Sequence, residues 1–349
     1  MYCMNNDTTS SRKLEHVRIV LEEDVAAKGI MAGFAAYLLP HEALPELDLA
    51  SIDLHSHFLG KSLAAPLLIS SMTGGASDVA HLNMALAEAA QSLGLAMGVG
   101  SQRAAIQDHQ QAYTYQVRKV APDILLFANL GAVQLNYGYG INECQRAVEM
   151  IEADALILHL NALQEAVQPE GNTNFAGLLA KIEQICSALD VPVIVKEVGN
   201  GISAPTARRL VDAGVQVIDV AGAGGTSWSE VERFRQQTEG GQRVAAHFAD
   251  WGIPTTEAIR QVRATLPDIP LIGSGGIRSG VDMAKAIALG ADLVGTAKPA
   301  LAPALHERGA QAVVDVLNEY LAELRIAMFC SGCANIAALK RIQMLRKTQ

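Results

Sequence analysis

Apolar runs alternate with amphipathic stretches along most of the chain from residue 65 onward. Eight short apolar runs, each followed by a stretch of helical periodicity, recur as parallel βαβ units require. These runs cover residues 65–72, 96–100, 124–130, 155–161, 192–198, 215–221, 270–275 and 293–297. Near-continuous apolar strands are typical of a parallel sheet covered by helices. The pattern therefore predicts an α/β protein built as a (β/α)8 TIM barrel. The competing architecture is a doubly wound sheet, in which the main glycine loop follows the first strand. The first apolar run of this chain is not followed by its main glycine loop.

Two segments fall outside the strand–helix rhythm. Residues 1–64 are expected to form an N-terminal arm and cap, and residues 65–349 the barrel, within a single domain overall. Residues 226–253 form an insertion after the sixth strand, which contains Trp228, His247 and Trp251. A long loop at the mouth of a barrel is more often a lid or a wall than idle sequence.

Composition narrows the possible partners. Half of the 349 residues are apolar, 18% are charged, and the net charge is −9. An acidic chain argues against nucleic acid as a partner, although a local cluster of Arg and Lys can still bind an anionic small molecule. The longest near-apolar run, residues 29–40, is too short to cross a bilayer, and the N-terminus has no apolar signal core. With five cysteines expected to be reduced thiols, we predict a cytoplasmic protein without a membrane partner.

A glycine-rich turn follows the seventh apolar run, in the segment Gly273-Ser-Gly-Gly-Ile-Arg278. Gly275 and Gly276 allow the backbone to approach a ligand closely, because no Cβ intrudes. The backbone N–H groups of the helix that follows attract an anion, and Arg278 adds a planar cation suited to phosphate. Since barrels commonly bind phosphate on the loops after strands 7 and 8, this turn is predicted to hold a phosphate group.

Lys196 lies within the fifth apolar run, where an unpaired lysine is rare. It could form a Schiff base, or it could remain cationic beside an electron-rich cofactor. An ion pair with Glu197 is the third interpretation, and it is weaker because adjacent strand residues face opposite ways.

The end of the fourth run places an imidazole, two amides and a carboxylate within seven residues: His159, Asn161, Gln164 and Glu165. Glu165 could ligate Mg²⁺, which prefers oxygen donors, and Gln164 could hydrogen-bond a substrate or relay a proton. Alternatively, His159 is a satisfied interior histidine and the other residues form a solvated turn. Near the N-terminus, Arg12 and Lys13 could clamp a diphosphate or could simply begin a solvated helix.

Seven segments together resemble the type 2 isopentenyl-diphosphate isomerases, a family of FMN-dependent barrels. The segments are Arg12-Lys13-x-x-His16, Leu68-Ile-Ser-Ser-Met-Thr-Gly-Gly75, Gly98-Val-Gly-Ser-Gln-Arg103, His159-x-Asn161-x-x-Gln164-Glu165, Val195-Lys-Glu197, Gly222-x-Gly-Gly-Thr-Ser-Trp228 and Gly273-Ser-Gly-Gly-Ile-Arg278.

The resemblance implies a role for each matching residue. FMN would contact Ser71, Met72, Thr73, Gly74, Ser101, Asn129 and Lys196, with its phosphate end on Thr226, Ser227, Gly275, Gly276, Arg278, Ala297 and Lys298. The substrate diphosphate would bind Arg12, Lys13, Ser101, Gln102 and Arg103, with Mg²⁺ on Glu165 and Gln164 near the isoprenoid carbons. The expected catalytic residues are His159, Asn161, Gln164 and Lys196.

The implied reaction interconverts isopentenyl and dimethylallyl diphosphate in isoprenoid biosynthesis. It uses reduced FMN, with NADPH as the reductant, in a homotetramer or homo-octamer. One alternative is an FMN-dependent 2-hydroxy-acid oxidase or dehydrogenase on the same barrel, with His247 as its active-site histidine. A barrel like inosine-monophosphate dehydrogenase needs a cysteine after the sixth strand, and residues 222–228 contain none. A phosphate-binding scaffold without turnover is the non-enzymatic alternative.

Overall fold

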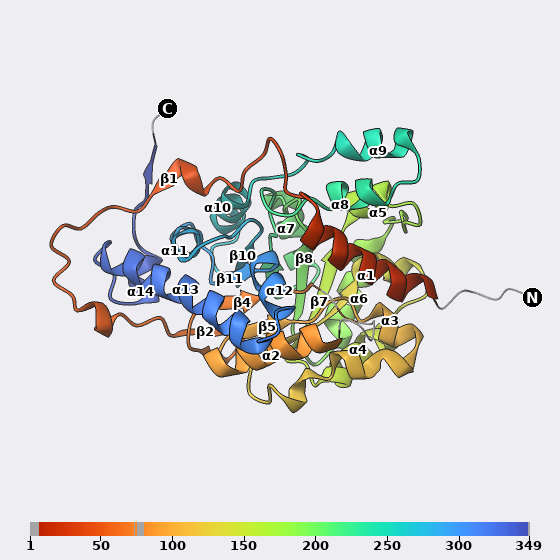
Figure 1. The fold of residues 1–349 in the computed structure, drawn as a ribbon, viewed down its shortest axis with the longest axis horizontal. Coiled ribbons are helices and arrows are strands. Elements are labelled where there is room, and N and C mark those ends of the chain that lie inside the picture. Colours follow the sequence, from red (N-terminus) through yellow and green to blue (C-terminus); the bar gives the residue numbers. More distant parts are fainter. Residues whose placement is uncertain (1–6, 73, 75–79, 348–349) are drawn as a thin grey trace, which may run out of the picture.

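Eight parallel strands close into a barrel in this computed structural model, which describes residues 7–72, 74 and 80–347 (Figure 1). In order around the barrel they are β4 (Leu67–Ile69), β5 (Ala96–Gly98), β6 (Leu126–Gly131), β7 (Ala155–Leu160), β8 (Val193–Glu197), β9 (Val217–Asp219), β10 (Leu271–Ser274) and β11 (Leu293–Thr296). Each strand falls within or overlaps one of the eight predicted runs, and β11 pairs with β4 to close the ring. The (β/α)8 prediction is therefore confirmed.

Helices surround the strands and bury their outward faces. The helices of this layer are α2 (Ala80–Leu93), α3 (Arg103–Gln107), α4 (Ile141–Ile151), α6 (Leu178–Ala188), α7 (Ala204–Asp212), α10 (Thr255–Thr265), α11 (Gly280–Ala288) and α13 (Ala310–Phe329). Because α13 packs against both α11 and α2, the helical layer is continuous where the barrel closes between β11 and β4. No helix within the described ranges combines the length and the apolar character that crossing a membrane requires.

The inside of the barrel is apolar at one end and polar at the other. Phe127, Ile157, Ile194, Val217 and Ile272 belong to the apolar interior cluster. Side chains two residues apart on a strand point the same way, so the next inward positions lie one layer closer to the carboxyl ends. Those positions are Asn129, His159, Lys196, Asp219 and Ser274. The alternation of the strands thus places a polar layer directly above the apolar interior.

A short hairpin closes the opposite end of the barrel. Strands β2 (Ser56–Phe58) and β3 (Lys61–Leu63) pair antiparallel, and Phe58 and Leu63 pack into the interior cluster. The amino-terminal mouth is therefore filled by hydrophobic side chains, and the carboxyl-terminal mouth is left to bind ligands.

The chain before the barrel and the insertion after β9 lie beside one another at that carboxyl-terminal mouth. Helix α1 (Asp7–Glu22) contacts α8 (Trp228–Arg235), as Figure 1 shows. The insertion also forms α9 (Glu239–Ala246), and α8 and α9 both contact α5 (Ala162–Val167). Further along the N-terminal segment, β1 (Tyr37–Leu38) pairs with β12 (Leu345–Arg346) near the end of the chain.

A repeated ion-pair clamp ties the strand starts together on two sides of the barrel. Arg118 donates to backbone oxygens of residues 121, 122, 124 and 152 and to the carboxylate of Asp154, which also binds Lys61. Arg263 makes the matching set to residues 266, 267, 269 and 290 and to Asp292, which also binds Lys340. The clamps lie four strands apart, at β6–β7 and at β10–β11. The two arginines are the second residues of segments 117–124 and 262–269, which share the pattern Val-Arg-x-x-x-Pro-Asp-Ile. The structure thus reveals a half-barrel repeat that the strand–helix rhythm does not disclose.

Asp154→Asn is expected to lower the free energy of unfolding by about 1.5–3 kcal/mol, because hydrogen bonds from Lys61, Arg118 and the Leu126 N–H lose their charged acceptor. Burial raises the pKa of Asp154, but these donors outweigh it, and the pKa lies below its ordinary value. The carboxylate therefore contributes stability above the unfolded pKa of about 3.9, and this contribution is lost as the pH falls through the lower folded pKa. Denaturant unfolding at pH 7 and pH 3 measures this contribution to the free energy of unfolding. The control is Asp268→Asn, because Asp268 is exposed. An equal effect of both variants at pH 7 would contradict the clamp.

Candidate active site

The polar layer opens into two adjoining cavities at the carboxyl ends of the strands. The larger, about 600 Å³, lies among the loops that follow β4, β8, β9, β10 and β11. The smaller, about 150 Å³, lies under α1 and the ends of β4 to β8. Lys13, His16, Ser71, Met72, Lys196, Val198 and Trp228 line both. A molecule bound in one cavity would therefore lie next to a molecule bound in the other.

The glycine-rich turn after β10 forms part of the wall of the larger cavity. Gly276 has φ +68°, and a Cβ there would lie 2.8 Å from the Gly224 oxygen, so only glycine fits without a shift. Arg278 donates to the Gly224 oxygen at 3.2 Å, and Thr255 Oγ1 donates to the Gly275 oxygen at 2.6 Å. The two neighbouring loops thus hold the turn in a fixed shape. Thr226, Ala297 and Lys298, to which the resemblance assigned the phosphate end of FMN, line the same cavity.

The larger cavity fits a flavin mononucleotide. Its volume lies in the range of pockets that bind cofactors. Ser70 Oγ and Ser71 Oγ both line it, and both are buried without a hydrogen-bond partner in the described part of the chain. Buried hydroxyls are normally satisfied, so these two call for a ligand with polar atoms at its edge. The glycine turn and Arg278 line the same cavity. The cavity therefore offers a site for a phosphate group and, at the two serines, polar contacts for the edge of a flavin ring.

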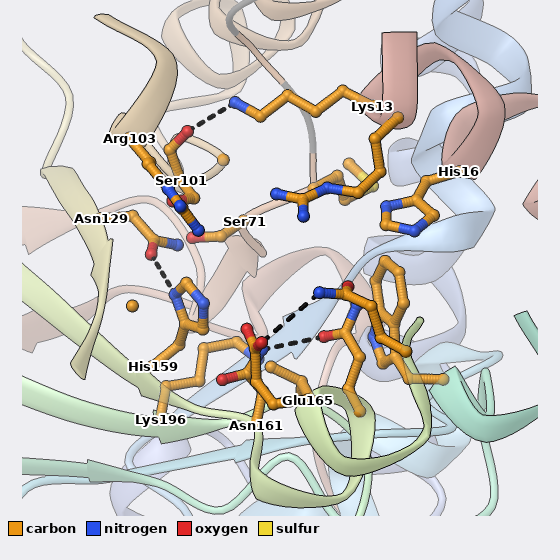
Figure 2. Close-up of a pocket in the computed structure, with 18 of the residues that line it drawn as sticks. Lys13, His16, Ser71, Ser101, Arg103, Asn129, His159, Asn161, Glu165 and Lys196 are labelled. Atoms are coloured by element: carbon orange, nitrogen blue, oxygen red, sulfur yellow. Dashed lines mark hydrogen bonds between the residues drawn. The ribbon is translucent and has the colours of Figure 1, made fainter. Parts of the chain in front are cut away.

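Besides Lys196, three cationic side chains among the described residues line the smaller cavity: Arg12, Lys13 and Arg103. Lys13 Nζ donates to the Ser101 oxygen at 2.7 Å, as Figure 2 shows. It also donates to Tyr115 Oη at 2.6 Å and to the Gly74 oxygen. Burial lowers the pKa of Lys13 to about 7, and the charges of Arg12 and Arg103 act in the same direction. Arg103 Nε is buried and has no partner among the residues described. The cluster is therefore short of negative charge, as a site for a polyanion should be.

His159 is a neutral imidazole, and one of its two nitrogens has no hydrogen-bond partner among the residues described. Figure 2 shows its Nδ1 joined to Asn129 Oδ1, at 2.8 Å. An amide oxygen only accepts, so Nδ1 carries the hydrogen and Nε2 keeps a lone pair. Burial lowers the pKa of His159 to about 3, and the charges of Lys196 and Lys13 add to this. At neutral pH, His159 therefore acts as a hydrogen-bond acceptor rather than as a cation.

Gln164 is held at both ends of its amide. Its Oε1 accepts from Asn161 Nδ2 at 3.1 Å, and its Nε2 donates to Glu232 Oε1 at 3.1 Å. Glu232 is itself buried, and it also bonds His16 Nε2 at 3.0 Å and Arg235 at 2.6 Å. The network leaves Gln164 little rotational freedom, so it can orient a substrate with precision.

Glu165 is the one carboxylate among the described residues that line the smaller cavity. Its Oε1 accepts from Asn161 Nδ2 at 3.0 Å, and its Oε2 accepts from the Asn172 N–H at 2.5 Å. Asn161 Oδ1 is buried and unpartnered within the described residues. No set of three His, Cys, Asp or Glu able to hold a metal occurs in that part of the chain. These donors fit Mg²⁺ only where a bound diphosphate and water complete its oxygen ligands.

Most of the described residues expected at the site line one cavity or both, and three of them do not. Thr73 lies outside the described residues. The side chain of Gln102 points away from both cavities, where it donates to the Ala147 oxygen at 2.8 Å and accepts from the Asn129 N–H at 2.9 Å. Gln102 thus braces the backbone instead of facing the substrate, contrary to the expectation. Ser227 is buried as the N-cap of α8, and Gly74 contributes its backbone oxygen to Lys13.

The site also contains residues for which the sequence predicted no role in binding or catalysis. Trp228 lines both cavities and packs edge-on against His16, with ring centroids 5.2 Å apart. Its place at the end of a glycine-rich motif was a usable signal. Asp219 and Ser274 lie in the polar layer, and strand alternation could have found both. Glu232 carries no such signal. His247, proposed for the alternative oxidase, is exposed at the end of α9 and lines neither cavity.

Comparison with known proteins defines the class. The family model described as FMN-dependent dehydrogenase matches residues 151–346. A solved structure of a putative lactate oxidase from Pediococcus acidilactici superposes with a TM-score of 0.68 at 19% identity, covering 100% of this chain and 96% of that one. A mandelate oxidase structure gives 0.66 at 20% identity, covering 96% and 99%. Fold and sequence model together define a barrel of the FMN-dependent dehydrogenase class, and the two oxidases share the fold alone.

Curated relatives narrow the class to a family. The isopentenyl-diphosphate delta-isomerase of Synechocystis sp. is 59% identical over 338 residues, covering 97% of this chain and 96% of the relative. The enzyme of the same name from Nostoc sp. is 54% identical over 352 residues, covering 99% and 100%. The chain belongs to the isopentenyl-diphosphate delta-isomerase family, which is a family of isomerases.

Proposed function

We propose that this protein interconverts isopentenyl diphosphate and dimethylallyl diphosphate, with reduced FMN in the larger cavity and the substrate in the smaller one. The observation that carries the proposal is that the two cavities share Lys196 and Ser71. One cavity has a phosphate-binding turn, and the other has a cluster of cations. A flavin and a diphosphate ester bound in them would meet at the shared residues.

FMN would rest against Ser71, Met72 and Lys196, with its phosphate at the glycine turn, Arg278 and Lys298. When bound in its reduced form, it supplies an electron-rich ring that exchanges a proton, so the double bond can move with no net redox change. Ordinary side chains do not readily protonate an alkene, so the chain's own residues are assigned to binding and orientation. Lys196 would lie beside the ring, where the ammonium group of its side chain would favour negative charge.

The diphosphate would be held by Arg12, Lys13 and Arg103, with Mg²⁺ on Glu165. Anchoring this remote end positions the reacting carbons beside Gln164, whose amide is fixed by Asn161 and Glu232. The neutral His159 would help to orient the substrate by accepting a hydrogen bond at Nε2. Helix α1 and Trp228 would cover the bound substrate and exclude water.

We further propose NADPH as the reductant, a cytoplasmic location and assembly as a homotetramer or homo-octamer. Residues 1–64 would serve as the arm and cap, and residues 65–349 as the catalytic barrel. Stopped-flow reduction tests the reductant, cell fractionation tests the location, and light scattering tests the oligomeric state.

The first experiment is a visible spectrum of the purified protein. The proposal expects a flavin spectrum that NADPH bleaches anaerobically, followed by isomer formation when isopentenyl diphosphate and Mg²⁺ are added. Bleaching by lactate or glycolate without NADPH would instead establish the 2-hydroxy-acid oxidase. A protein with no affinity for FMN would exclude both activities.

The ratio kcat/KM is expected to fall as the pH rises from 7 to 9. Lys13 in the free enzyme has a pKa of about 7, and its protonated form, present at lower pH, is the one that attracts the diphosphate. As the pH rises through 7 this charge is lost, and kcat/KM reports the ionisation of the free enzyme. Lys13→Met should lower kcat/KM at pH 7 and flatten the profile above it. A wild-type profile that is level from pH 7 to 9 would exclude Lys13 as a titrating substrate ligand.

A further inference from the structure

The polar layer of the barrel contains a carboxylate to which the proposed reaction assigns no task. Asp219 ends β9 with none of its surface exposed. It is the Cα partner of Lys196 on the neighbouring strand β8. Paired residues of adjacent parallel strands project from the same face of the sheet, and residues two positions earlier, Val217 and Ile194, lie in the interior cluster. Asp219 and Lys196 therefore both point into the barrel, side by side.

The Asp219 carboxylate is only half satisfied. Its Oδ1 accepts from Ser274 Oγ at 2.6 Å and from the Ala221 N–H at 3.3 Å. Its Oδ2 is buried and has no hydrogen-bond partner in the described ranges. Burial raises the pKa of Asp219, and the charge of Lys196 is the largest influence that opposes this. A carboxylate in this position needs a nearby cation to remain charged.

Lys196 is equally short of a close counter-charge. Its Nζ donates to the backbone oxygen of Glu197 at 2.5 Å, and no carboxylate of the described residues lies within 4.0 Å of it. The Glu197 carboxylate turns outward and accepts from the N–H groups of residues 198, 199 and 200. The buried ammonium therefore has Asp219 as its paired acidic neighbour inside the barrel, while its other side lines both cavities.

We propose that Asp219 is a positioning residue that acts as the buried counter-charge of Lys196 and thereby limits the positive charge which Lys196 presents to FMN. The inference rests on the proposed function, because it takes the ligand of the larger cavity to be FMN. Ser274 fixes the carboxylate through Oδ1. A negative charge behind Lys196 opposes the gain of negative charge on the flavin ring, so its removal favours the reduced over the oxidised cofactor.

The test is a redox titration of FMN in holoenzyme carrying Asp219→Asn. The variant keeps the size of the side chain and removes its charge. We expect the ratio of the affinity for reduced FMN to the affinity for oxidised FMN to be at least tenfold higher in the variant than in the wild type. This change corresponds to a rise of about 30 mV or more in the two-electron midpoint potential. Asp154→Asn, at the other end of the barrel, removes a carboxylate of structural role and should leave the potential unchanged. An unchanged potential in Asp219→Asn, or an equal shift in Asp154→Asn, overturns the inference.

A second variant covers the case in which Asp219→Asn does not fold. Ser274→Ala removes the donor that favours the ionised carboxylate, so a smaller rise in potential is expected, and no rise overturns the inference. The wild-type protein separates the two proposals. If it binds no FMN, the proposed function and this inference both fail. If it binds FMN but the variants leave its potential unchanged, only the role of Asp219 fails.

Discussion

Lys196→Met is expected to lower kcat by about 10²–10³-fold, the loss typical of removing one electrostatic stabiliser from a preorganised site. Lys196 is 8% exposed and lines both cavities, so its charge acts at short range on whatever binds there. Methionine keeps the length and apolar stem of lysine, and Asp219 can take up a proton once the ammonium is gone. The barrel should therefore remain folded. The measurement is kcat with saturating FMN and excess reductant, alongside thermal unfolding.

Lys181→Met is the matched control for this experiment. Lys181 is also partly buried, and its Nζ donates to a backbone oxygen, that of Leu135, at 2.6 Å. It lines neither cavity. Its replacement should cost stability without a loss of kcat. If Lys196→Met turns over within threefold of wild type, Lys196 has no electrostatic part in the reaction.

Arg103→Met is expected to lower kcat/KM by roughly 10- to 150-fold, mainly through a higher KM. A hydrogen bond to a charged partner contributes about 1.5–3 kcal/mol, and Arg103 lines the smaller cavity and has a buried Nε without a partner in the described part of the chain. Steady-state kinetics with isopentenyl diphosphate measure the change. The control is Arg146→Met, because Arg146 donates to the Ile106 oxygen at 3.3 Å and lines neither cavity. Equal kcat/KM in both variants would remove Arg103 from the diphosphate site.

The fold could be predicted from the sequence because parallel strands buried on both faces read as apolar runs. The site could largely be predicted for a related reason. The carboxyl ends of all eight strands meet at one mouth, so polar residues such as Asn129, His159 and Lys196 converge there wherever they stand in the chain.

Side-chain direction and long-range packing could not be predicted in the same way. Gln102 follows a strand end, yet the chain turns it toward Ala147 instead of the cavity. The burial of Lys13 depends on α1 lying over the mouth, and no local pattern determines that contact. Glu232 acts through His16 and Gln164, which lie 216 and 68 residues away in sequence. Such a network becomes visible only once the insertion and the N-terminal helix are placed together.

The central claim is that reduced FMN and a diphosphate substrate occupy neighbouring cavities and that the double bond moves without net redox change. The most direct measurement is the number of dimethylallyl diphosphate molecules formed per FMN after a single anaerobic reduction, with the flavin spectrum followed throughout. The account predicts many turnovers per flavin while the spectrum stays that of reduced FMN. One product or fewer per flavin, with reoxidation of FMN as the substrate is consumed, would contradict it.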